Sequence, residues 1–267
     1  VLDLDHDDAR LAIQVADVKD YVWVYDLAQG QGRKLPDSTG YGWPAFAPDG
    51  SVAMTMSRRT AATLETRIRI VPGDGSASYL ALDSGELEAA VSDWTPDGQA
   101  LALSDWVSLS MGLLPASGTG EIRYLESNTL EWGGMFSPDG KWLSFSSDQS
   151  GRFEIWVRSL DDRGQRRQIT ANGGIESVWC PCGRIYFRRG DEFWFVPVEP
   201  GATPTFGQEQ LAFTVTDFLD TPGRSYDVSS DGEVLYTLKR SEPAVVDRIH
   251  VIANWLGSLA AREGSVR

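Results

Sequence analysis

Five carboxylates recur in the short runs that precede turn motifs along this chain: Asp3, Asp5, Asp93, Glu176 and Asp227. Glu131 stands just before another such run. Carboxylates that crowd together can bind a cation or a basic segment of a partner. The simpler interpretation is that they are ordinary solvated residues at strand ends. A catalytic pair of the glycosidase type needs a geometry that a sequence does not show.

Other kinds of catalysis lack their usual motifs. The chain has no G-x-S-x-G nucleophile elbow, no P-loop and no G-x-G-x-x-G fingerprint. Its two histidines, His6 and His250, are too few for a histidine-metal cluster. Cys180 and Cys182 have C-x-C spacing, and we expect them to replace the Ser and Asp of a repeated turn rather than to hold zinc. We therefore expect no cofactor, apart from a cation held by the carboxylates.

A turn motif recurs six times and organises the whole chain. Its clearest copies are Trp43–Gly50, Trp94–Gly98 and Phe136–Gly140, each ending in Pro-Asp-Gly. Weaker copies end at Gly183 and Gly232, and a degenerate one ends at Ala9. The copies end 41 to 49 residues apart. A repeat of that length built from β-strands indicates a propeller.

One unit shows how four strands fit into a repeat. After the turn, Lys141–Ser146 alternates as a half-buried strand does, Phe153–Arg158 forms a third strand and Arg166–Thr170 an outer one. The predicted fold is all-β, a six-bladed β-propeller of four-stranded antiparallel blades over residues 1–255, with a tail at 256–267. The last unit lacks an obvious outer strand, which predicts that the ring closes with a strand from elsewhere.

The fold explains why the carboxylates matter. The first strand of each propeller blade lines the central channel, so the five carboxylates are expected at the channel. Trp43, Trp94, Trp132 and Trp179 recur near the same turn, which favours packing between blades over a ligand platform. Two aromatic residues outside the regular positions, Tyr41 and Trp106, are the candidates for a binding rim.

Composition excludes several partners. The chain of 267 residues has 24 Lys and Arg against 38 Asp and Glu, a formal net charge of −14, which repels nucleic-acid phosphates. No apolar stretch approaches the ~20 residues of a membrane span. Because the chain begins inside a repeat and without Met, we expect it to be part of a longer polypeptide.

The turn and following strand, Phe136–Ser146, resemble the WD40-like PD40 repeats of the TolB propeller family. Tyr21–Leu27 and Arg248–Leu256 are similar to segments of C-terminal TolB-like propellers in bacterial multidomain proteins, which follow a kinase or a DNA-binding signalling domain. The chain departs from the pattern at Asp5–Asp8 and Cys180–Gly183. The resemblance implies a bacterial, extracytoplasmic or periplasmic location.

Two functions fit these observations. The first is a non-catalytic sensor or scaffold domain of a larger bacterial signalling protein, which binds a ligand or a basic protein or peptide partner. The alternative is a lactonase- or lyase-like propeller enzyme that uses a metal held by carboxylates in the central channel. A deep pocket with free, convergent carboxylates distinguishes the enzyme from the binding domain.

Overall fold

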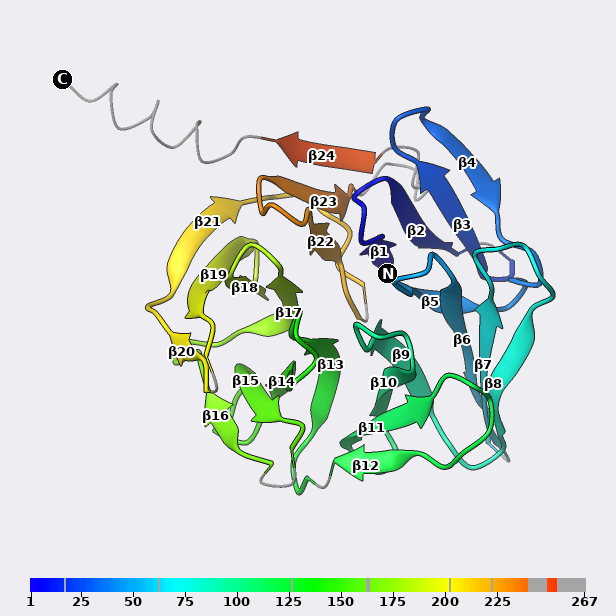
Figure 1. Ribbon diagram of the computed structural model, residues 1–267, viewed down its shortest axis with the longest axis horizontal. Helices are drawn as coiled ribbons and strands as arrows, with labels where there is room; N and C mark the ends of the chain where they lie inside the picture. Colours follow the sequence, from blue (N-terminus) through cyan, green and yellow to red (C-terminus); the bar gives the residue numbers. More distant parts are fainter. Residues whose placement is uncertain are drawn as a thin grey trace.

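The computed structural model of this chain describes residues 1–16, 18–61, 63–125, 127–161, 164–201, 203–221, 223–239 and 249–253. These residues form 24 strands and no helix, in antiparallel sheets arranged around a central axis (Figure 1). The predicted β-propeller is therefore confirmed. The structure has five complete blades and a partial sixth in place of the six equal blades expected.

The first three blades each have four strands in sequence order. Blade 1 contains β1 (Leu2–Leu4), β2 (Arg10–Val15), β3 (Tyr21–Asp26) and β4 (Gln31–Lys34). Blade 2 contains β5 (Gly42–Phe46), β6 (Val52–Arg59), β7 (Leu64–Val71) and β8 (Tyr79–Ser84). Blade 3 contains β9 (Ala89–Trp94), β10 (Ala100–Asp105), β11 (Ser110–Pro115) and β12 (Arg123–Leu125).

The last three blades are less uniform. Blade 4 contains β13 (Glu131–Phe136), β14 (Trp142–Ser147), β15 (Glu154–Ser159) and β16 (Arg166–Gln168). Blade 5 contains β17 (Ile175–Cys180), β18 (Arg184–Arg189) and β19 (Glu192–Glu199), and both β20 (Thr205–Phe206) and β21 (Gln210–Thr214) pair with β19. Blade 6 contains β22 (Tyr226–Val228), β23 (Val234–Leu238) and β24 (Ile249–Ala253).

Blade 6 is partial because it has three strands within the described residues. Its third strand, β24, begins within the segment Arg248–Leu256 that resembles the C-terminal TolB-like propellers. Arg248 and the tail at 256–267 lie outside the described residues. Closure of the ring by a strand from elsewhere stays a prediction.

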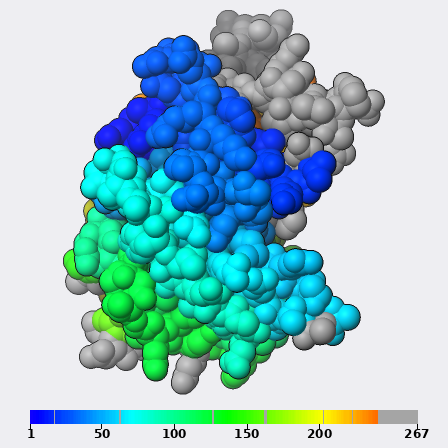
Figure 2. Space-filling model, turned by 90° about the vertical axis from the view of Figure 1, so that its right-hand side faces the viewer, coloured from blue at the N-terminus to red at the C-terminus, as the bar shows by residue number. Residues whose placement is uncertain are grey.

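The first strand of each blade is innermost, as expected. β1 contacts β5, β5 contacts β9, β9 contacts β13, β13 contacts β17, β17 contacts β22 and β22 returns to β1. These six strands surround the axis in Figure 1, while blades 1 and 2 cover one flank of the molecule in Figure 2. Residues near both ends of the sequence therefore meet at the channel.

The Pro-Asp-Gly turns join the first and second strands of the blades. Gly140 has φ 69°, a conformation that a β-branched residue resists, and its N–H bonds the carbonyl of Ser137 at 2.8 Å. Asp139 Oδ1 accepts the N–H of Lys141 at 3.1 Å and a hydrogen bond from the Ser137 hydroxyl at 2.6 Å. The glycines of three other turns also have positive φ: Gly50, Gly98 and Gly232.

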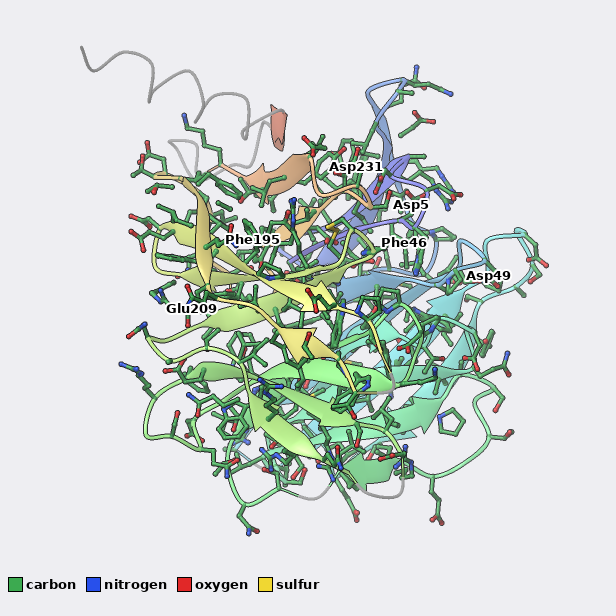
Figure 3. All side chains as sticks on the ribbon, turned by 60° about the vertical axis from the view of Figure 1, so that its left-hand side comes forward. Asp5, Phe46, Asp49, Phe195, Glu209 and Asp231 are labelled. Atoms are coloured by element: carbon green, nitrogen blue, oxygen red, sulfur yellow. A yellow bond between two sulfur atoms is a disulfide. The ribbon has the colours of Figure 1, made fainter. Side chains whose placement is uncertain are left out.

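The two turns that depart from the Pro-Asp-Gly pattern have the same backbone geometry as the others but different side-chain bonds. Asp8, at φ 55°, takes the place of the glycine in the first turn, and Asp5 Oδ1 accepts the N–H groups of Ala9 at 2.7 Å and Arg10 at 2.9 Å. In the fifth turn, Cys180 and Cys182 are joined by a disulfide at the positions of Ser137 and Asp139. A covalent bond there replaces the side-chain hydrogen bond found in the third, fourth and sixth turns. Asp5 and the turn residues Asp49 and Asp231 are labelled in Figure 3.

Two of the four recurrent tryptophans pack between blades as predicted. Trp94 lies in a buried cluster with Ile68 and Ile70 of blade 2, and its indole N–H bonds the carbonyl of Ala45 at 3.0 Å. Trp179 packs against blade 4 in the same way, in a cluster that includes Trp142. Both stand four residues before the turn glycine, at the end of the inner strand.

Candidate functional site

Three of the predicted carboxylates connect neighbouring blades through the main chain. Each stands five residues before the end of its turn, and each accepts a hydrogen bond from an N–H of the next inner strand. The pairs are Asp3 with Phe46 at 2.6 Å, Asp93 with Phe136 at 2.8 Å and Asp227 with Leu4 at 2.9 Å. These carboxylates therefore stabilise the ring, and all three are partnered.

One guanidinium lies among them. Arg224 donates to Asp3, to Asp227 at 3.3 Å and to the carbonyl of Ser92 at 3.4 Å. Burial raises the pKa of Asp3 to about 8, although Arg224 opposes the shift. Burial also raises the pKa of Asp93 to about 6 and raises that of Asp227. One guanidinium does not neutralise three buried carboxylates, so the cluster favours retention of protons.

The other two carboxylates have partners of a different kind. Glu176 Oε1 is 2.5 Å from Arg188, and its Oε2 accepts the N–H of Ser225 at 2.9 Å. Burial raises the pKa of Glu176, and Arg188 opposes this shift. Asp5 belongs to its turn and pairs with Arg10 at 2.7 Å. Four of the five carboxylates, Asp3, Asp5, Asp93 and Asp227, thus line one cavity of the channel, and Glu176 lines the other.

Glu131, noted just before a predicted run, lies within β13. Its Oε1 accepts a hydrogen bond from Ser127 at 2.8 Å and one from Arg166. It is buried and lines neither of the two cavities in the channel. The residue therefore links blade 4 to its own outer strand.

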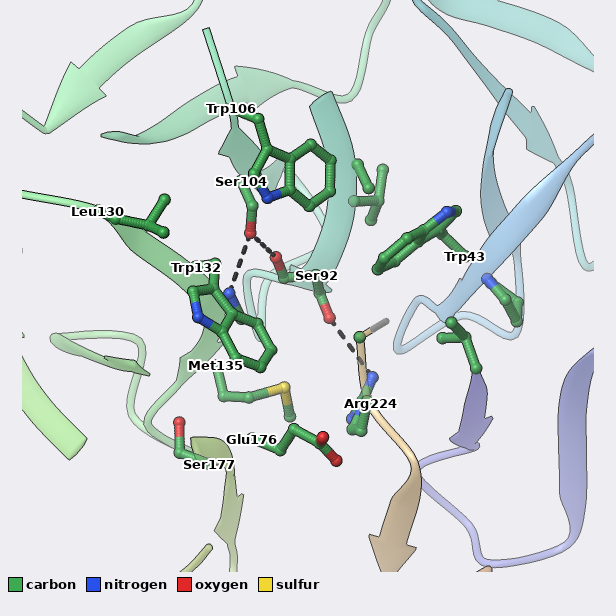
Figure 4. A pocket seen from close by; sticks show the side chains of 16 residues that line it. Trp43, Ser92, Ser104, Trp106, Leu130, Trp132, Met135, Glu176, Ser177 and Arg224 are labelled. Carbon is green, nitrogen blue, oxygen red and sulfur yellow. Dashed lines mark hydrogen bonds between the residues drawn. The ribbon is translucent and has the colours of Figure 1, made fainter. Parts of the chain in front are cut away.

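The channel contains two cavities separated by Arg224 and Met135, which line both. The cavity on the side of the turns, about 320 Å³, is lined by Asp5, His6 and several turn prolines. The cavity at the opposite end, about 260 Å³, is lined largely by apolar groups (Figure 4). We call this second cavity the tryptophan mouth.

Three indole rings from two inner strands and one loop surround the tryptophan mouth: Trp43 on β5, Trp132 on β13 and Trp106 directly after β10 (Figure 4). The rings of Trp43 and Trp106 are tilted at 57° with centroids 5.6 Å apart. Trp132 meets Phe153 edge-on at 6.1 Å. A Cβ at Gly223 would lie 2.3 Å from the Trp43 ring, so this indole packs directly on the main chain.

Bulges in three inner strands shape this mouth. Trp43, Gly133 and Glu176 all stand seven residues before their turn glycine, and all are left-handed, with φ of 52°, 69° and 58°. The strand register shifts at each of these places. Bulges re-aim side chains, and left-handed non-glycine residues carry strain that concentrates at functional sites.

The preceding blade supports each bulge. Its second strand provides a side chain that accepts the N–H of the left-handed residue. The pairs are Gln14 with Trp43 at 3.3 Å, Ser104 with Gly133 at 3.0 Å and Ser146 with Glu176 at 3.1 Å. The mouth is therefore held in shape by the blades around it.

The rim candidates have different positions. Trp106 lines the tryptophan mouth and reaches its rim. Tyr41, in contrast, is buried with 7% of its surface exposed, and the Arg69 guanidinium lies 5.6 Å from its ring centroid. Tyr41 is therefore a core residue and not a rim residue, because its ring packs between blades 1 and 2 beside Val22 and Met54.

Trp43 and Trp132 also correct the sequence interpretation. They stand seven and eight residues before their turn glycines, whereas Trp94 and Trp179 stand four before theirs. The four tryptophans therefore do not share one place in the repeat. The first pair lines the mouth, and the second pair packs between blades.

No cluster of three or more His, Cys, Asp or Glu side chains among the described residues is arranged to hold a metal ion. The three channel aspartates have Arg224 among them, where a shared cation would need to bind. Within the same residues, no helix is long and apolar enough to cross a bilayer.

Comparison with known proteins supports the fold. No protein-family model matches the chain, and no curated protein matches it. Among solved structures, TolB from Acinetobacter baumannii superposes with a TM-score of 0.69 at 15% identity, over 93% of this chain and 62% of that one. The chain has the fold of a TolB-like β-propeller. It spans less than two thirds of that TolB.

Other similar structures have different functions. A putative TolB from Agrobacterium tumefaciens gives a TM-score of 0.62 at 17% identity, covering 80% of this chain and 79% of that one. An oligogalacturonate lyase in complex with manganese gives 0.59 at 15% identity, covering 94% and 75%. At such identities the similarity concerns the fold alone, and function has to be argued from the site.

Proposed function

We propose that this chain is a non-catalytic binding domain, a sensor or scaffold within a larger bacterial signalling protein. Its ligand, or a side chain of a protein or peptide partner, enters the tryptophan mouth. The observation that carries this proposal is the group of three indoles around a cavity of about 260 Å³. Concave, mostly apolar pockets with a few convergent polar groups are the usual form of ligand sites.

The polar groups at the bottom of this cavity favour binding over catalysis. Glu176 is engaged by Arg188 and by the Ser225 N–H, and Arg224 is engaged by two aspartates. A general base or nucleophile needs a free group within reach of the substrate. The indoles are therefore the main recognition surface that the mouth offers.

The TolB-like fold is compatible with a binding role, and the manganese-bound lyase keeps the enzyme hypothesis as the second candidate. The feature that favours the enzyme is the trio of buried aspartates, Asp3, Asp93 and Asp227, with raised pKa values. In that mechanism a metal would have to displace Arg224. Binding of Mn²⁺ measured by calorimetry, with Asp227→Asn as the variant, tests this second candidate.

The binding proposal is tested by a ligand screen with fluorescence of the tryptophans as the readout. Trp106→Ala is expected to weaken binding of any hit at least tenfold, because buried aromatic anchors carry much of the binding energy. Trp23→Ala is the matched control, since Trp23 is also half-buried but lines neither channel cavity. Equal losses in both variants, or none in Trp106→Ala, contradict the proposal.

A further inference from the structure

We propose that the tryptophan mouth binds a quaternary ammonium group. The inference rests on the proposed function, since it names the chemical group that the proposed ligand site takes. A cation over an indole face within about 6 Å of the ring is attracted by the ring quadrupole, and cages of several aromatic rings recognise methylated ammonium groups. The mouth has three indoles, contributed by three separate elements.

The size of the cavity fits such a group. Its volume of about 260 Å³ is several times the ~30 Å³ that one water occupies in the liquid, which leaves room for an ammonium with its methyl groups. Leu130 and Met135 complete the lining, and methyl groups gain from burial against both. A compact, strongly hydrated ammonium would lose its water here for few hydrogen bonds, because the lining is largely apolar.

The charges around the mouth favour a cation. Glu176 and Arg224 are the charged side chains that line it, and Arg224 is paired with Asp3 and Asp227. Glu176 places a carboxylate at the mouth itself, whereas Asp3, Asp93 and Asp227 line the other cavity. The whole chain has a formal charge of −14, which attracts cationic ligands by steering.

Backbone strain provides independent support. Trp43 and Glu176 are left-handed non-glycine residues at the same position of two blades, where blade 4 has Gly133. Each places a large side chain at the mouth, one an indole and one a carboxylate. Strain of this kind costs of order 1–3 kcal/mol per residue and persists where the surroundings impose it. The mouth therefore presents both aromatic faces and one carboxylate, and both attract a cation.

Choline and its neutral isostere 3,3-dimethyl-1-butanol provide the test, with tryptophan fluorescence and calorimetry on the full chain. Choline is expected to bind at least tenfold more tightly than the isostere, and more weakly as salt concentration rises. Trp106→Ala is expected to lose at least tenfold in choline affinity, Trp106→Phe to retain part of it, and Trp23→Ala to match the wild type. Thermal melts confirm that each variant folds.

The outcomes separate the inference from the proposed function. Equal binding of choline and the isostere overturns the cation inference and leaves an apolar ligand site. If neither choline nor the isostere binds, the inference is overturned as well. The proposed function also fails if, in addition, Trp106→Ala leaves the affinity of every hit of the ligand screen unchanged. A trimethyllysine peptide that binds more tightly than choline identifies the source as a protein partner, whereas equal affinity indicates a free small molecule.

Discussion

Replacement of Asp93 by Asn is expected to stabilise the protein at alkaline pH. Burial raises the pKa of Asp93 from 3.8 to about 6, a shift of about 2 units. Each unit corresponds to ~1.4 kcal/mol, so ionisation of Asp93 costs the folded state about 3 kcal/mol. Asn carries no charge, and its carbonyl can still accept the N–H of Phe136, which Asp93 accepts at 2.8 Å.

The sign follows from proton binding. Between pH 4 and pH 6 the folded chain keeps a proton on Asp93 that the unfolded chain has lost, so the stability of the wild type falls as pH rises. Asp93→Asn avoids this loss. We expect it to exceed the wild type by up to about 3 kcal/mol in free energy of unfolding at pH 8 and to approach it at pH 4.

Urea unfolding of both proteins at several pH values between 4 and 8 measures this difference. Asp93 also helps to raise the pKa of Asp3, so removal of its charge adds to the gain expected for Asp93→Asn at alkaline pH. Asp93→Ala is the control, because it also removes the charge but leaves the Phe136 N–H without its acceptor, which costs ~1–3 kcal/mol at every pH. A constant difference between Asp93→Asn and the wild type across this range would refute the assigned burial penalty.

Three further variants test other parts of the structure. Gly140→Val is expected to lower the free energy of unfolding by roughly 1–3 kcal/mol, measured by urea titration, because Gly140 has φ 69°; an unchanged midpoint contradicts the turn assignment. Arg224→Met is expected to destabilise by ~3–5 kcal/mol at pH 8 and less at pH 5, where the aspartates hold more protons; a pH-independent loss contradicts the cluster. The double variant Cys180→Ser, Cys182→Asp is expected to have a thermal midpoint equal to or above that of the reduced wild type, because a hydrogen bond of ~1 kcal/mol then links the turn. A clearly lower midpoint contradicts the equivalence of the disulfide and the Ser-Asp hydrogen bond.

The sequence predicted the fold well because its turns are local features. Proline, aspartate and glycine act within four residues, and the structure shows the same hydrogen bonds at Gly98, Gly140 and Gly232. The spacing of the turns then predicted a propeller, in which the first strand of each unit lies at the axis. The lack of an outer strand in the last blade, which has three strands within the described residues, was also predicted, but the segment that completes the blade could not be, since an edge strand depends on which segment is close in space.

The site was less predictable because its partners come from neighbouring blades. Asp3, Asp93 and Asp227 were found by register, but the main-chain N–H that each one binds lies on another blade and leaves no signal in the sequence. The tryptophan mouth was missed for a related reason. Trp43 and Trp132 stand three to four residues earlier in the repeat than Trp94 and Trp179, and the bulges that turn them toward the mouth have no clear signal in the sequence.

Two kinds of inner strand divide the work of the channel. Blades 1, 3 and 6 carry the aspartates that bind the next blade, whereas blades 2, 4 and 5 have Ala45, Met135 and Val178 at that position and a left-handed residue two positions earlier. The hydrogen bonds of the aspartates thus lie below the mouth, whereas each bulged residue bonds the preceding blade through its main-chain N–H, whatever its side chain. Side chains at the mouth can therefore differ in size and charge, as Trp43, Gly133 and Glu176 do, while the ring beneath keeps its connections. Such a separation suits a fold in which binding depends on a few exposed residues and stability depends on the repeated strands below them.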